Sequence, residues 1–580
     1  MKRLLPLLCF AACAPASRID DGSARVSVLP SLTERCATSP AALCAFFDAP
    51  ACAASEAVTA CVEAADVDCL AAQRCSATRP DGGRPFSPGP WGTGIKALAA
   101  PFTVATIDGT FDLEADWTGV DSYLFFAHDG TNGAFFAPAA LAATLARSPR
   151  DVHWFFGWRG ATAPSDFDAA REAWLARLDT LPAEERAHWR PRVHFLVESF
   201  DQQPSWLAQR FAAPAGTPPE YRAIVPNHGF AIDPLQRIRE LGMLGRLTGS
   251  GQSAELSFLA HHAQAFAFEA ARQRQLDDDG AHVITLAEAQ RVHDWLDLDV
   301  TLPELTPFDT LEVDLALDCP QHLAGNCGAW DYLSHLWRCV PATGADGGAD
   351  WQCDQELARW ITPYWAEGRW VTDISAQLAA LGPGPQHLRF FAQGQWDPRA
   401  TDYLVSLSLR LRQKQRGARP VALHPLWQGG DWNHTYDALR VPQAVTVPAD
   451  AQRVELVVLV TGHGGVTGTN CAEFCDHQHL FQVNEAPFLI TFPEAQSADT
   501  CAERVSEGVV PNQFGTWYFG RGGWCPGWDV APHVFDVTSA VRRGEANTLT
   551  YTTRLDGQPL TEALGGQGNL VLSSWLVVWR

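Results

Sequence analysis

The sequence predicts a multidomain protein with a small cysteine-rich helical module, an α/β middle and an all-β C-terminal half. A chain of 580 residues is too long for a single hydrophobic core. Its sixteen cysteines are unevenly spread, since six lie from residue 36 to 75 and none from 76 to 318. Beyond about residue 300, apolar residues recur with a period of two, which indicates half-buried strands.

The first 20 residues have the features of an export signal. In MKRLLPLLCFAACAP, basic Lys2 and Arg3 precede an apolar run that ends in small residues and is too short to cross a bilayer. FAAC also resembles a bacterial lipobox, in which Cys13 would be lipidated and would attach the mature protein to a membrane. We therefore expect an exported bacterial protein that is secreted, periplasmic or anchored as an outer-membrane lipoprotein.

Residues 31–90 are expected to form a small helical module and a linker. Ala, Glu and Leu dominate between the cysteines, and so short a module needs covalent support. Exported chains with an even number of cysteines usually pair them, so three disulfides are expected here. The stretch TRPDGGRPFSPGPWGTG has the glycine and proline content of a linker.

Residues 91–298 are expected to form an α/β domain. The apolar runs YLFFAH, VHWFFGW and VHFLVES alternate with amphipathic stretches such as DFDAAREAWLARLDTL. FTVATIDGTFDLEADW and YRAIVPNHGFAIDPLQRIRELG resemble the start and end of a thioredoxin-like domain of the peroxiredoxin type. Because this segment has no cysteine to act as nucleophile or resolving thiol, the resemblance implies a scaffold without redox activity.

Two antiparallel β-sandwiches are expected, at residues 299–415 and 416–580. In LEVDLALDC and YLVSLSLRLR, alternate residues are apolar and face one way: Leu311, Val313, Leu315 and Leu317 in the first, and Val405, Leu407, Leu409 and Leu411 in the second. RVELVVLVTG, HVFDVTSAV, TLTYTTRL and NLVLSSWLVVWR continue this pattern, with turns rich in Gly, Pro and Asn between them. Such a succession of strands is typical of β-sandwiches or jelly rolls.

The charge balance excludes one class of partner. Asp and Glu number 66 against 43 for Lys and Arg, which gives a formal net charge of -23. An acidic protein of this kind repels phosphate backbones, so we do not expect nucleic-acid binding.

Three places in the β-rich half combine cysteine with a group that can do chemistry. They are CPQHLAGNCGAWDY at 319–332, CAEFC at 471–475 and FGRGGWCPG at 519–527. Cys319 and Cys327 are placed to close a hairpin before Asp331, and Cys501 is a candidate partner for Cys525, which leaves Cys339 and Cys353 to close the loop between. From spacing alone, Cys471 and Cys475 around Glu473 fit a metal site, a redox pair or a disulfide loop.

The same motifs, in this order, resemble the bacterial peptide:N-glycosidase F family. CAEFC, GRGGWCPG, WDY and RWITPYW at 359–365 are similar to family motifs, and the resemblance covers residues 300–580. It implies two packed eight-stranded jelly rolls with an active site at their interface. It also implies hydrolysis of the amide between Asn and the first N-acetylglucosamine of N-linked glycans, on glycoproteins or glycopeptides, without metal or other cofactor.

The resemblance assigns three catalytic residues. Asp331 matches the principal catalytic carboxylate, Glu473 the carboxylate inside a small Cys471–Cys475 disulfide loop, and Arg521 the arginine at the substrate. An amide is a poor electrophile, so a shielded carboxylate acting as general acid or base is chemically sensible. A tight loop would hold Glu473 in one direction, and Arg521 would stabilise developing negative charge.

The sequence also departs from the family. Where the family has a further acidic residue before a tryptophan matching Trp396, this chain has Gly394, flanked by Gln393 and Gln395. His463 stands where a tryptophan is expected. These changes at the substrate site imply a changed water network or glycan specificity, or loss of activity. Trp330, Trp365, Trp396 and Trp524 are candidates for stacking on sugars.

Two other functions compete with the amidase. His477-Gln-His479 has the H-x-H form that copper uses in two-jelly-roll peptide monooxygenases, although the β-rich half has no methionine to supply a thioether. The other alternative is a non-catalytic exported protein that binds glycopeptides or an envelope protein, which would explain both the absent redox cysteines and the absent carboxylate. In each case we expect a monomer.

Overall fold

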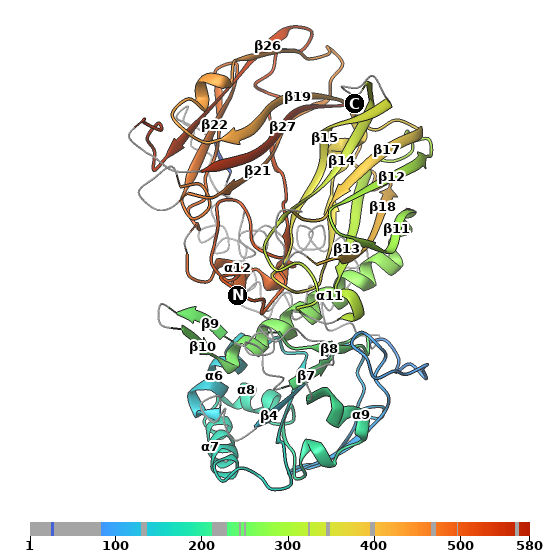
Figure 1. The fold of residues 1–580 in the computed structure, drawn as a ribbon, viewed down its shortest axis with the longest axis vertical. Helices are drawn as coiled ribbons and strands as arrows, with labels where there is room; N and C mark the ends of the chain where they lie inside the picture. Colours follow the sequence, from blue (N-terminus) through green and yellow to red (C-terminus); the bar gives the residue numbers. More distant parts are fainter. Residues whose placement is uncertain are drawn as a thin grey trace, which may run out of the picture.

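The computed structural model describes most of the chain from residue 83 onward. The described residues are 25–27, 83–128, 136–211, 229–242, 245–248, 251–322, 325–343, 349–394, 401–465, 471–495, 497–562 and 568–580. The predictions for the leader with Cys13, for the cysteine-rich residues 31–82, and for Gln395 and Trp396 lie outside the described residues. Figure 1 shows an α/β part below two β-sandwiches.

The first β-sandwich is a jelly roll of eight consecutive strands: β11 His282–Val292, β12 Trp295–Leu302, β13 Thr310–Asp318, β14 Leu333–Thr343, β15 Ala349–Ile361, β16 Gly368–Asp373, β17 Gly384–Phe391 and β18 Tyr403–Arg412. Its two sheets run β11-β18-β13-β16 and β12-β17-β14-β15, and β24 extends the second. Counted along the chain, these orders are first-eighth-third-sixth and second-seventh-fourth-fifth, which is the jelly-roll arrangement. The short helices η6 Pro320–His322 and η7 Ser375–Ala379 lie between strands.

The alternation predicted for β13 and β18 is confirmed. The apolar residues Leu311, Val313, Leu315 and Leu317 are buried, as are Val405, Leu407, Leu409 and Leu411. However, the expected boundary at residue 299 is too late, because β11 and β12 start at His282 and Trp295 and pair with β18 and β17 of the jelly roll. The β-rich half therefore begins at His282.

The second β-sandwich repeats the same strand order. Its strands are β19 Pro420–Asp431, β20 Gln443–Thr446, β21 Arg453–His463, β22 His477–Val483, β23 Ala486–Ile490, β25 His533–Asp536, β26 Ala546–Leu555 and β27 Asn569–Trp579. They form the sheets β19-β27-β21-β25 and β23-β22-β26-β20, and β1 Arg25–Ser27 pairs in parallel with β23. The short β24 Trp528–Asp529 crosses to β15 of the first jelly roll, so the two sandwiches share a strand connection. Between the strands lie η8 Asp437–Leu439, α12 Thr500–Glu503 and η9 Val505–Glu507.

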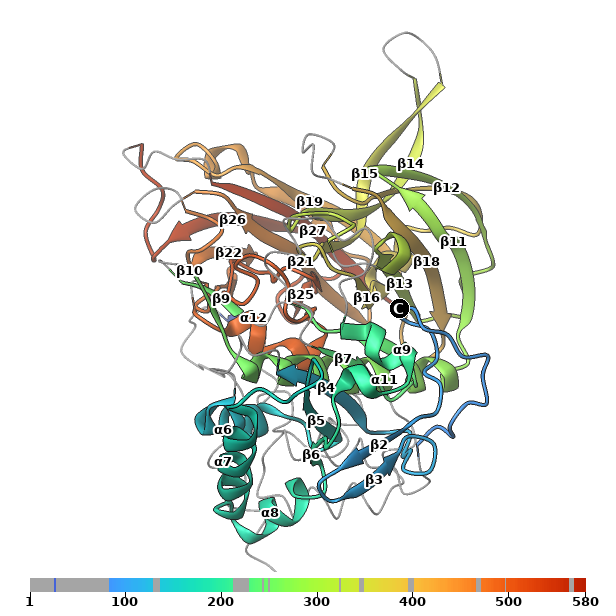
Figure 2. The same ribbon diagram turned by 60° about the horizontal axis from the view of Figure 1, so that its bottom comes forward.

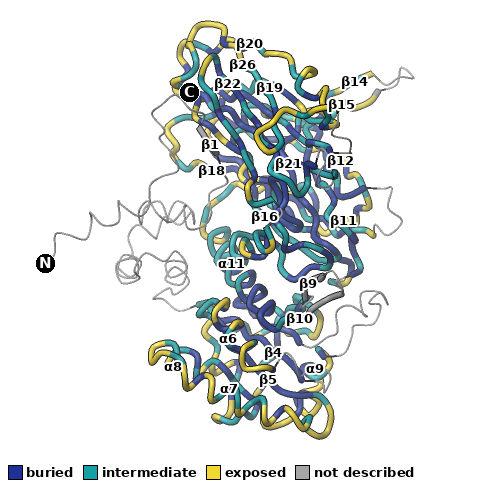
Figure 3. The backbone as a smooth tube through the Cα atoms, turned by 90° about the vertical axis from the view of Figure 1, so that its left-hand side faces the viewer, coloured by how far each residue is buried: buried dark blue, intermediate teal, exposed yellow. Residues whose placement is uncertain are grey.

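The middle of the chain forms the predicted α/β layer. A five-stranded sheet runs β6-β5-β4-β7-β8, in which β5 is parallel to β4 and β6, while β7 and β8 are antiparallel to their neighbours. The strands are β4 Ser122–His128, β5 Val152–Trp158, β6 Val193–Phe195, β7 Gly229–Ile232 and β8 Ile238–Glu240, with the hairpins β2 Thr103–Thr106 with β3 Gly109–Asp112, and β9 Gly245–Thr248 with β10 Gly251–Ala254. The helices are α6 Pro138–Arg147, α7 Phe167–Asp179, α8 Ala183–Trp189, α9 Ser205–Ala208 and α11 Leu259–Asp278, with η3 Phe200–Gln202, η4 Gln209–Phe211 and η5 Leu256–Phe258. Figure 3 shows β4 and β5 as buried strands, in keeping with their apolar sequences.

Helix α11 joins the α/β layer to the first jelly roll. Figures 1 and 2 both place it between the two parts. From α11, Arg272 donates to the carbonyl of Arg369 at 2.6 Å, and Gln273 accepts from the guanidinium of Arg369 at 2.7 Å. Just before the helix, the carbonyl of Phe258 accepts from the side chain of Asn512 at 2.7 Å. Across the described residues, no helix is both long and apolar enough to span a membrane.

Four disulfides staple the β-rich half. The pairs are Cys319–Cys327, Cys339–Cys353, Cys471–Cys475 and Cys501–Cys525. Cysteine spacing predicted three of them, and the family resemblance implied the Cys471–Cys475 pair. Disulfides persist in oxidising compartments, so this number of them fits an exported protein.

Candidate active site

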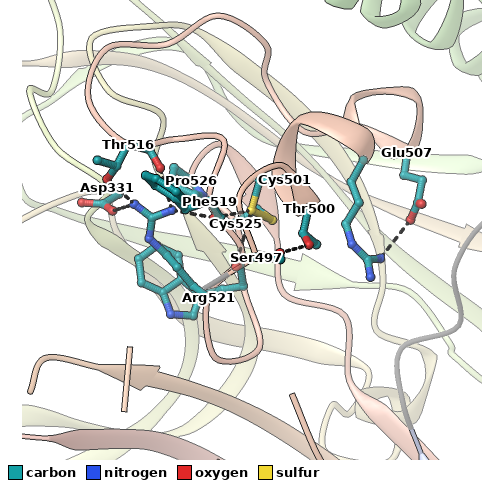
Figure 4. Close-up of a disulfide and its surroundings, with 12 residues drawn as sticks. Asp331, Ser497, Thr500, Cys501, Glu507, Thr516, Phe519, Arg521, Cys525 and Pro526 are labelled. Atoms are coloured by element: carbon teal, nitrogen blue, oxygen red, sulfur yellow. Dashed lines mark hydrogen bonds and ion pairs between the residues drawn. A yellow bond between two sulfur atoms is a disulfide. The ribbon is translucent and has the colours of Figure 1, made fainter. Parts of the chain in front are cut away.

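The three predicted catalytic residues converge at the junction of the two jelly rolls. Asp331 lies two residues before β14 in the first jelly roll, whereas Glu473 lies between β21 and β22 of the second. Arg521 lies in the long connection between β23 and β24. Its guanidinium is 3.4 Å from an oxygen of Asp331 and 3.4 Å from an oxygen of Glu473. Figure 4 shows Asp331 and Arg521 facing one another.

Arg521 is a buried cation held in one orientation. Only 1% of it is exposed. One guanidinium nitrogen donates to the carbonyls of Thr516 and Phe519, at 3.2 and 3.0 Å, and the other donates to the hydroxyl of Thr516 at 3.1 Å. The rings of Trp524 and Phe474 lie 4.8 and 5.1 Å from its central carbon, and such faces stabilise a desolvated cation. The guanidinium can therefore meet negative charge without first rearranging.

Asp331 has a partner that our sequence reasoning missed. The hydroxyl of Tyr364 donates to Oδ2 of Asp331 at 2.6 Å and accepts from Arg521 at 3.2 Å. The backbone N–H of Tyr364 is in turn bonded to the side chain of Gln513 at 2.9 Å. Tyr364 lies inside the motif RWITPYW, so the motif was visible in the sequence, but nothing in it distinguished this tyrosine from the neighbouring tryptophan, Trp365.

The environment of Asp331 favours its protonated form. Burial raises the pKa of Asp331 to about 6, which outweighs the opposing effects of Arg521 and of the Tyr364 hydrogen bond, while the charge of Glu473 raises it further. Burial and the charge of Asp331 also raise the pKa of Tyr364, so this hydroxyl stays a proton donor. A carboxyl with such a pKa is suited to proton transfer near neutral pH.

Glu473 is held by its backbone as well as by the disulfide. The carbonyl of Glu473 accepts from the N–H of Gly522 at 2.7 Å, and its own N–H donates to the carbonyl of Gly464 at 3.2 Å. The carboxylate accepts from the N–H of Gly464 at 3.2 Å. Its side chain is 25% exposed, so Glu473 is the more open of the two carboxylates to substrate.

Gly522 lets this loop lie close to Arg521. A Cβ at position 522 would be 2.3 Å from Nε2 of His477 and 2.5 Å from the carbonyl of Ala472. Only glycine therefore allows the segment that carries Arg521 to lie against the loop that carries Glu473. The GRGG sequence has a packing reason in addition to its resemblance to the family.

His463 and Trp524 form one wall beside Arg521. Their rings stack at 4.9 Å, His463 is hydrogen-bonded to the hydroxyl of Thr461 at 2.9 Å, and the indole N–H of Trp524 donates to the carbonyl of Gly462 at 2.7 Å. Burial holds the pKa of His463 well below its usual value. On the other side, Trp330 lies edge-on to Tyr364 at 6.0 Å, so two of the four predicted tryptophans, Trp330 and Trp524, lie beside the site.

The structure places Gln393 away from the open part of the site. Its side chain is fully buried, and its amide donates to the carbonyl of Thr401. Its oxygen and the hydroxyl of Tyr403 lie against Gly328, where a Cβ would be 2.6 and 2.7 Å from them. Gly394 brings no carboxylate to this position.

The H-x-H sequence forms part of the core and is not an open metal site. His477 and His479 are fully buried and hydrogen-bonded to each other at 2.7 Å, and His479 is bonded to the hydroxyl of Tyr551 at 2.8 Å. In the part of the chain that the structure describes, the group with metal-ligand spacing is Asp318, His322 and Glu367. There the ammonium of Lys96 pairs with both carboxylates, so this group already holds a cation. The described residues give the copper hypothesis no support.

The candidate site is thus formed by two carboxylates, one from each jelly roll, and one buried arginine. Comparisons with known proteins found similar sequences and structures. Residues 431–577 match the family model described as peptide-N-glycosidase F, C terminal. The peptide-N(4)-(N-acetyl-beta-D-glucosaminyl)asparagine amidase F of Elizabethkingia miricola is 23% identical over 266 residues, which cover 43% of this chain and 68% of that protein.

The comparison with solved structures found two further similar proteins. The glycosylasparaginase PNGase F of Flavobacterium meningosepticum is similar at 17% identity and a TM-score of 0.42, covering 52% of this chain and 96% of that one. The structure of PNGF-II is similar at 14% identity and a TM-score of 0.39, covering 55% and 67%. Within the β-rich half, residues 431–577 are thus similar to the C-terminal part of peptide-N-glycosidase F.

Proposed function

We propose that this protein is an amidase that hydrolyses the bond between the asparagine side chain and the first N-acetylglucosamine of N-linked glycans. Its substrates would be glycoproteins or glycopeptides, and its products a peptide with aspartate in place of asparagine and a glycosylamine. One observation carries the proposal: a buried guanidinium, Arg521, lies 3.4 Å from a carboxylate of each jelly roll, Asp331 and Glu473. The similarity to amidase F and to PNGase F supports it.

In this proposal, Asp331 acts first as general base and then as general acid. Its carboxylate takes a proton from water as the water oxygen adds to the amide carbonyl carbon, and it then gives that proton to the departing nitrogen as the C–N bond breaks. The pKa of about 6 suits both steps near neutral pH. The Tyr364 hydroxyl, at 2.6 Å, holds the carboxylate in place during the cycle.

Arg521 and Glu473 have the charge-stabilising and orienting roles. Negative charge develops on the amide oxygen when water adds, and a preorganised guanidinium stabilises that charge without reorganisation. Glu473 is more exposed and faces the same cation, so it can accept hydrogen bonds from the first sugar or from the asparagine amide. Trp330, Trp524 and His463 would frame the sugar, and no metal has a part in these steps.

The alternative is a non-catalytic exported protein that binds glycopeptides. The observation in its favour is Gly394, since the family has a carboxylate at this position. In either case we propose a monomer, exported by its leader and either secreted or lipidated at Cys13. We also propose that the α/β layer is a thioredoxin-like scaffold without redox cysteines, because β4, β5, β7 and β8 are ordered β5-β4-β7-β8 with α11 following.

Deglycosylation of a denatured N-glycoprotein, with a chelator present, tests the proposal. We expect released glycan and conversion of asparagine to aspartate at the glycosylation site, seen by mass spectrometry. Asp331→Asn should abolish the conversion, whereas Asp450→Asn, at an exposed ion pair with Arg580, should leave it unchanged. If the wild-type protein binds the glycopeptide but never converts its asparagine to aspartate at any pH, the amidase proposal is wrong and the non-catalytic binding function is supported.

A further inference from the structure

The outer face of one sheet of the first jelly roll carries an unusual set of side chains. This sheet contains β12, β17, β14 and β15, and register pairs Trp295 with Phe391 and Phe391 with His335. We call its open part the Trp295 face and define it by Trp295, Asp297, Asp299, Trp337, Trp351, His387, Arg389 and Phe391. None of these residues takes part in the site described above.

Trp295 is a large apolar group left open on this face. It is 48% exposed, although its ring packs on Phe391 with centroids 4.4 Å apart. The guanidinium of Arg389 lies 5.8 Å from the same ring and donates to Asp297 at 2.6 Å. The indole is thus fixed from one side and presented to solvent from the other.

A second exposed tryptophan lies across the sheet. Trp351 is 38% exposed and stacks on His387 with centroids 3.9 Å apart and 5° between the ring planes. His387 in turn is bonded to Asp299 at 2.8 Å and to Asp297 at 3.2 Å. Two ordered aromatic planes are therefore linked by a row of oriented hydrogen-bonding groups.

The Trp295 face continues from the candidate active site. Trp295 begins β12, Phe391 ends β17 and β14 begins two residues after Asp331, so all three positions lie at one end of the sheet. His335, which pairs with Phe391, follows Asp331 by four residues in the chain, a separation of at most about 13 Å for an extended segment. At the β15 edge, the second jelly roll covers the same sheet through Ser573 and Glu356, which are hydrogen-bonded at 2.6 Å.

We propose that the Trp295 face binds the outer sugars of a glycan whose innermost sugar lies at Asp331. Pyranose rings have an apolar C–H face that packs on flat aromatic rings, and hydroxyls that need both donors and acceptors at the edges. Trp295 and Trp351 supply the aromatic rings, while Asp297, Asp299 and Arg389 supply hydrogen-bond acceptors and donors for the hydroxyls at the edges of the sugar. Asp297 pairs with Arg389, and Asp299 is hydrogen-bonded to His387, so these groups are already partnered and a neutral ligand fits this face better than a strongly charged one. The inference rests on the proposed function and adds the place where the glycan arms bind.

Direct binding of a free oligosaccharide tests this face without requiring hydrolysis. The probe is a mannose-rich N-glycan with its chitobiose core, titrated calorimetrically into the full-length protein. Trp295→Ala and Trp351→Ala are each expected to weaken binding about tenfold, as truncation of an aromatic anchor commonly does. Val283→Ala is the matched control, because Val283 is 46% exposed on β11 of the other sheet. Equal affinity in wild type and both tryptophan variants, or no binding by wild type, overturns the proposal.

Kinetics on two glycopeptides separate this face from the chemistry. Trp295→Ala should raise KM about tenfold for a glycopeptide with full glycan arms and leave kcat unchanged. With a glycopeptide trimmed to chitobiose, KM should not change. An equal rise in KM on both substrates contradicts binding of the arms. If no variant hydrolyses either substrate while the free glycan still binds through Trp295, the amidase proposal fails and the glycan-binding face stands.

Discussion

At the scale of single residues, the proposed amide hydrolysis depends on the protonation of Asp331. Burial raises its pKa to about 6, above the usual value of 3.8, so the carboxylate required as base is lost as the pH falls through about 6. We expect kcat/KM to fall about tenfold per pH unit below this value, because one proton inactivates the base. A pH–rate profile of the wild-type protein checks this, and a flat profile between pH 5 and 8 contradicts it.

The raised pKa of Asp331 also predicts that this carboxyl lowers the stability of the folded protein at neutral and alkaline pH. A carboxyl whose folded-state pKa is raised contributes stability that is present below the unfolded pKa and lost as the pH rises through the folded pKa. Asp331→Asn should therefore unfold at a higher temperature than wild type at pH 8, and the gain should shrink toward pH 4. Thermal unfolding at the two pH values measures it, with Asp450→Asn as the control that changes little at either.

Sequence could name most residues of the site but not their contacts. Asp331, Glu473 and Arg521 could be proposed as catalytic candidates because each lies beside a cysteine or glycine motif with a fixed order. Tyr364 was missed, since its contact to Asp331 joins residues 33 positions apart and is set by the fold. Gln393 was expected at the substrate, yet its side chain, two residues beyond the end of β17, is fully buried and donates to the carbonyl of Thr401, a contact that the sequence alone did not indicate.

At the scale of elements, the loop that carries Glu473 depends on its disulfide for direction more than for folding. Cys471 and Cys475 are four residues apart, so breaking their bond releases a short loop, worth about 2 kcal/mol by the chain-entropy estimate. We expect Cys471→Ser with Cys475→Ser to remain folded and to lose about 100-fold in kcat, because a small displacement of a catalytic group costs that much.

A second disulfide gives the control for this element. Cys339→Ser with Cys353→Ser opens a cross-strand bond in the β14–β15 hairpin, where neither sulfur touches the candidate catalytic residues. Its kcat on a chitobiose glycopeptide should stay within about threefold of wild type. Similar losses of kcat in both double variants would show that stability alone explains the effect.

Strand prediction succeeded or failed according to how regular each strand is. β13 and β18 keep a strict alternation, and their sequence pattern located them. β11 has register shifts between Thr285 and Ala287 and between Ala287 and Gln290, which break the period of two. It is also a largely exposed edge strand, so its sequence carries little hydrophobic signal. β12, by contrast, alternates clearly in WLDLDVTL and could have been placed from the sequence.

At the scale of the whole molecule, the two jelly rolls are joined by a buried polar network. Arg359 of β15 donates to Oγ1 of Thr461 at 3.1 Å and to the carbonyl of Val571 at 2.7 Å, both in the second jelly roll. It also pairs with Glu356 at 2.7 Å, and Glu356 is bonded to His335 at 2.7 Å. Thr461 is bonded to His463 beside Arg521, so the interface and the site share one set of contacts. No sequence pattern indicated these partners, because they lie 100 or more residues apart.

Removing Arg359 should therefore affect stability and catalysis together. Arg359→Met leaves Glu356 buried without its main cation, and breaking a buried pair from one side costs about 3–5 kcal/mol. Arg359 is the main charge that holds the pKa of Glu356 well below its usual range, so this loss should appear above the unfolded pKa of a glutamate and fade as the pH falls below it. Denaturant unfolding of wild type and Arg359→Met at pH 7 and at pH 3.5 measures the loss of unfolding free energy at each pH.

A double variant distinguishes the ion pair from simple loss of packing. Arg359→Met with Glu356→Gln removes both charges, and it should be more stable than Arg359→Met alone, because no unpaired charge remains in the interface. Arg359→Met alone should also lower kcat/KM, since Thr461 and His463 lose a fixed neighbour. The control Asp450→Asn should leave the free energy of unfolding and the activation free energy from kcat/KM within about 1 kcal/mol of wild type. If Arg359→Met were as stable as wild type and fully active, the orientation of the two carboxylates would not depend on this interface, and the packing of Trp524, Val457 and Trp575 between the jelly rolls would have to supply it.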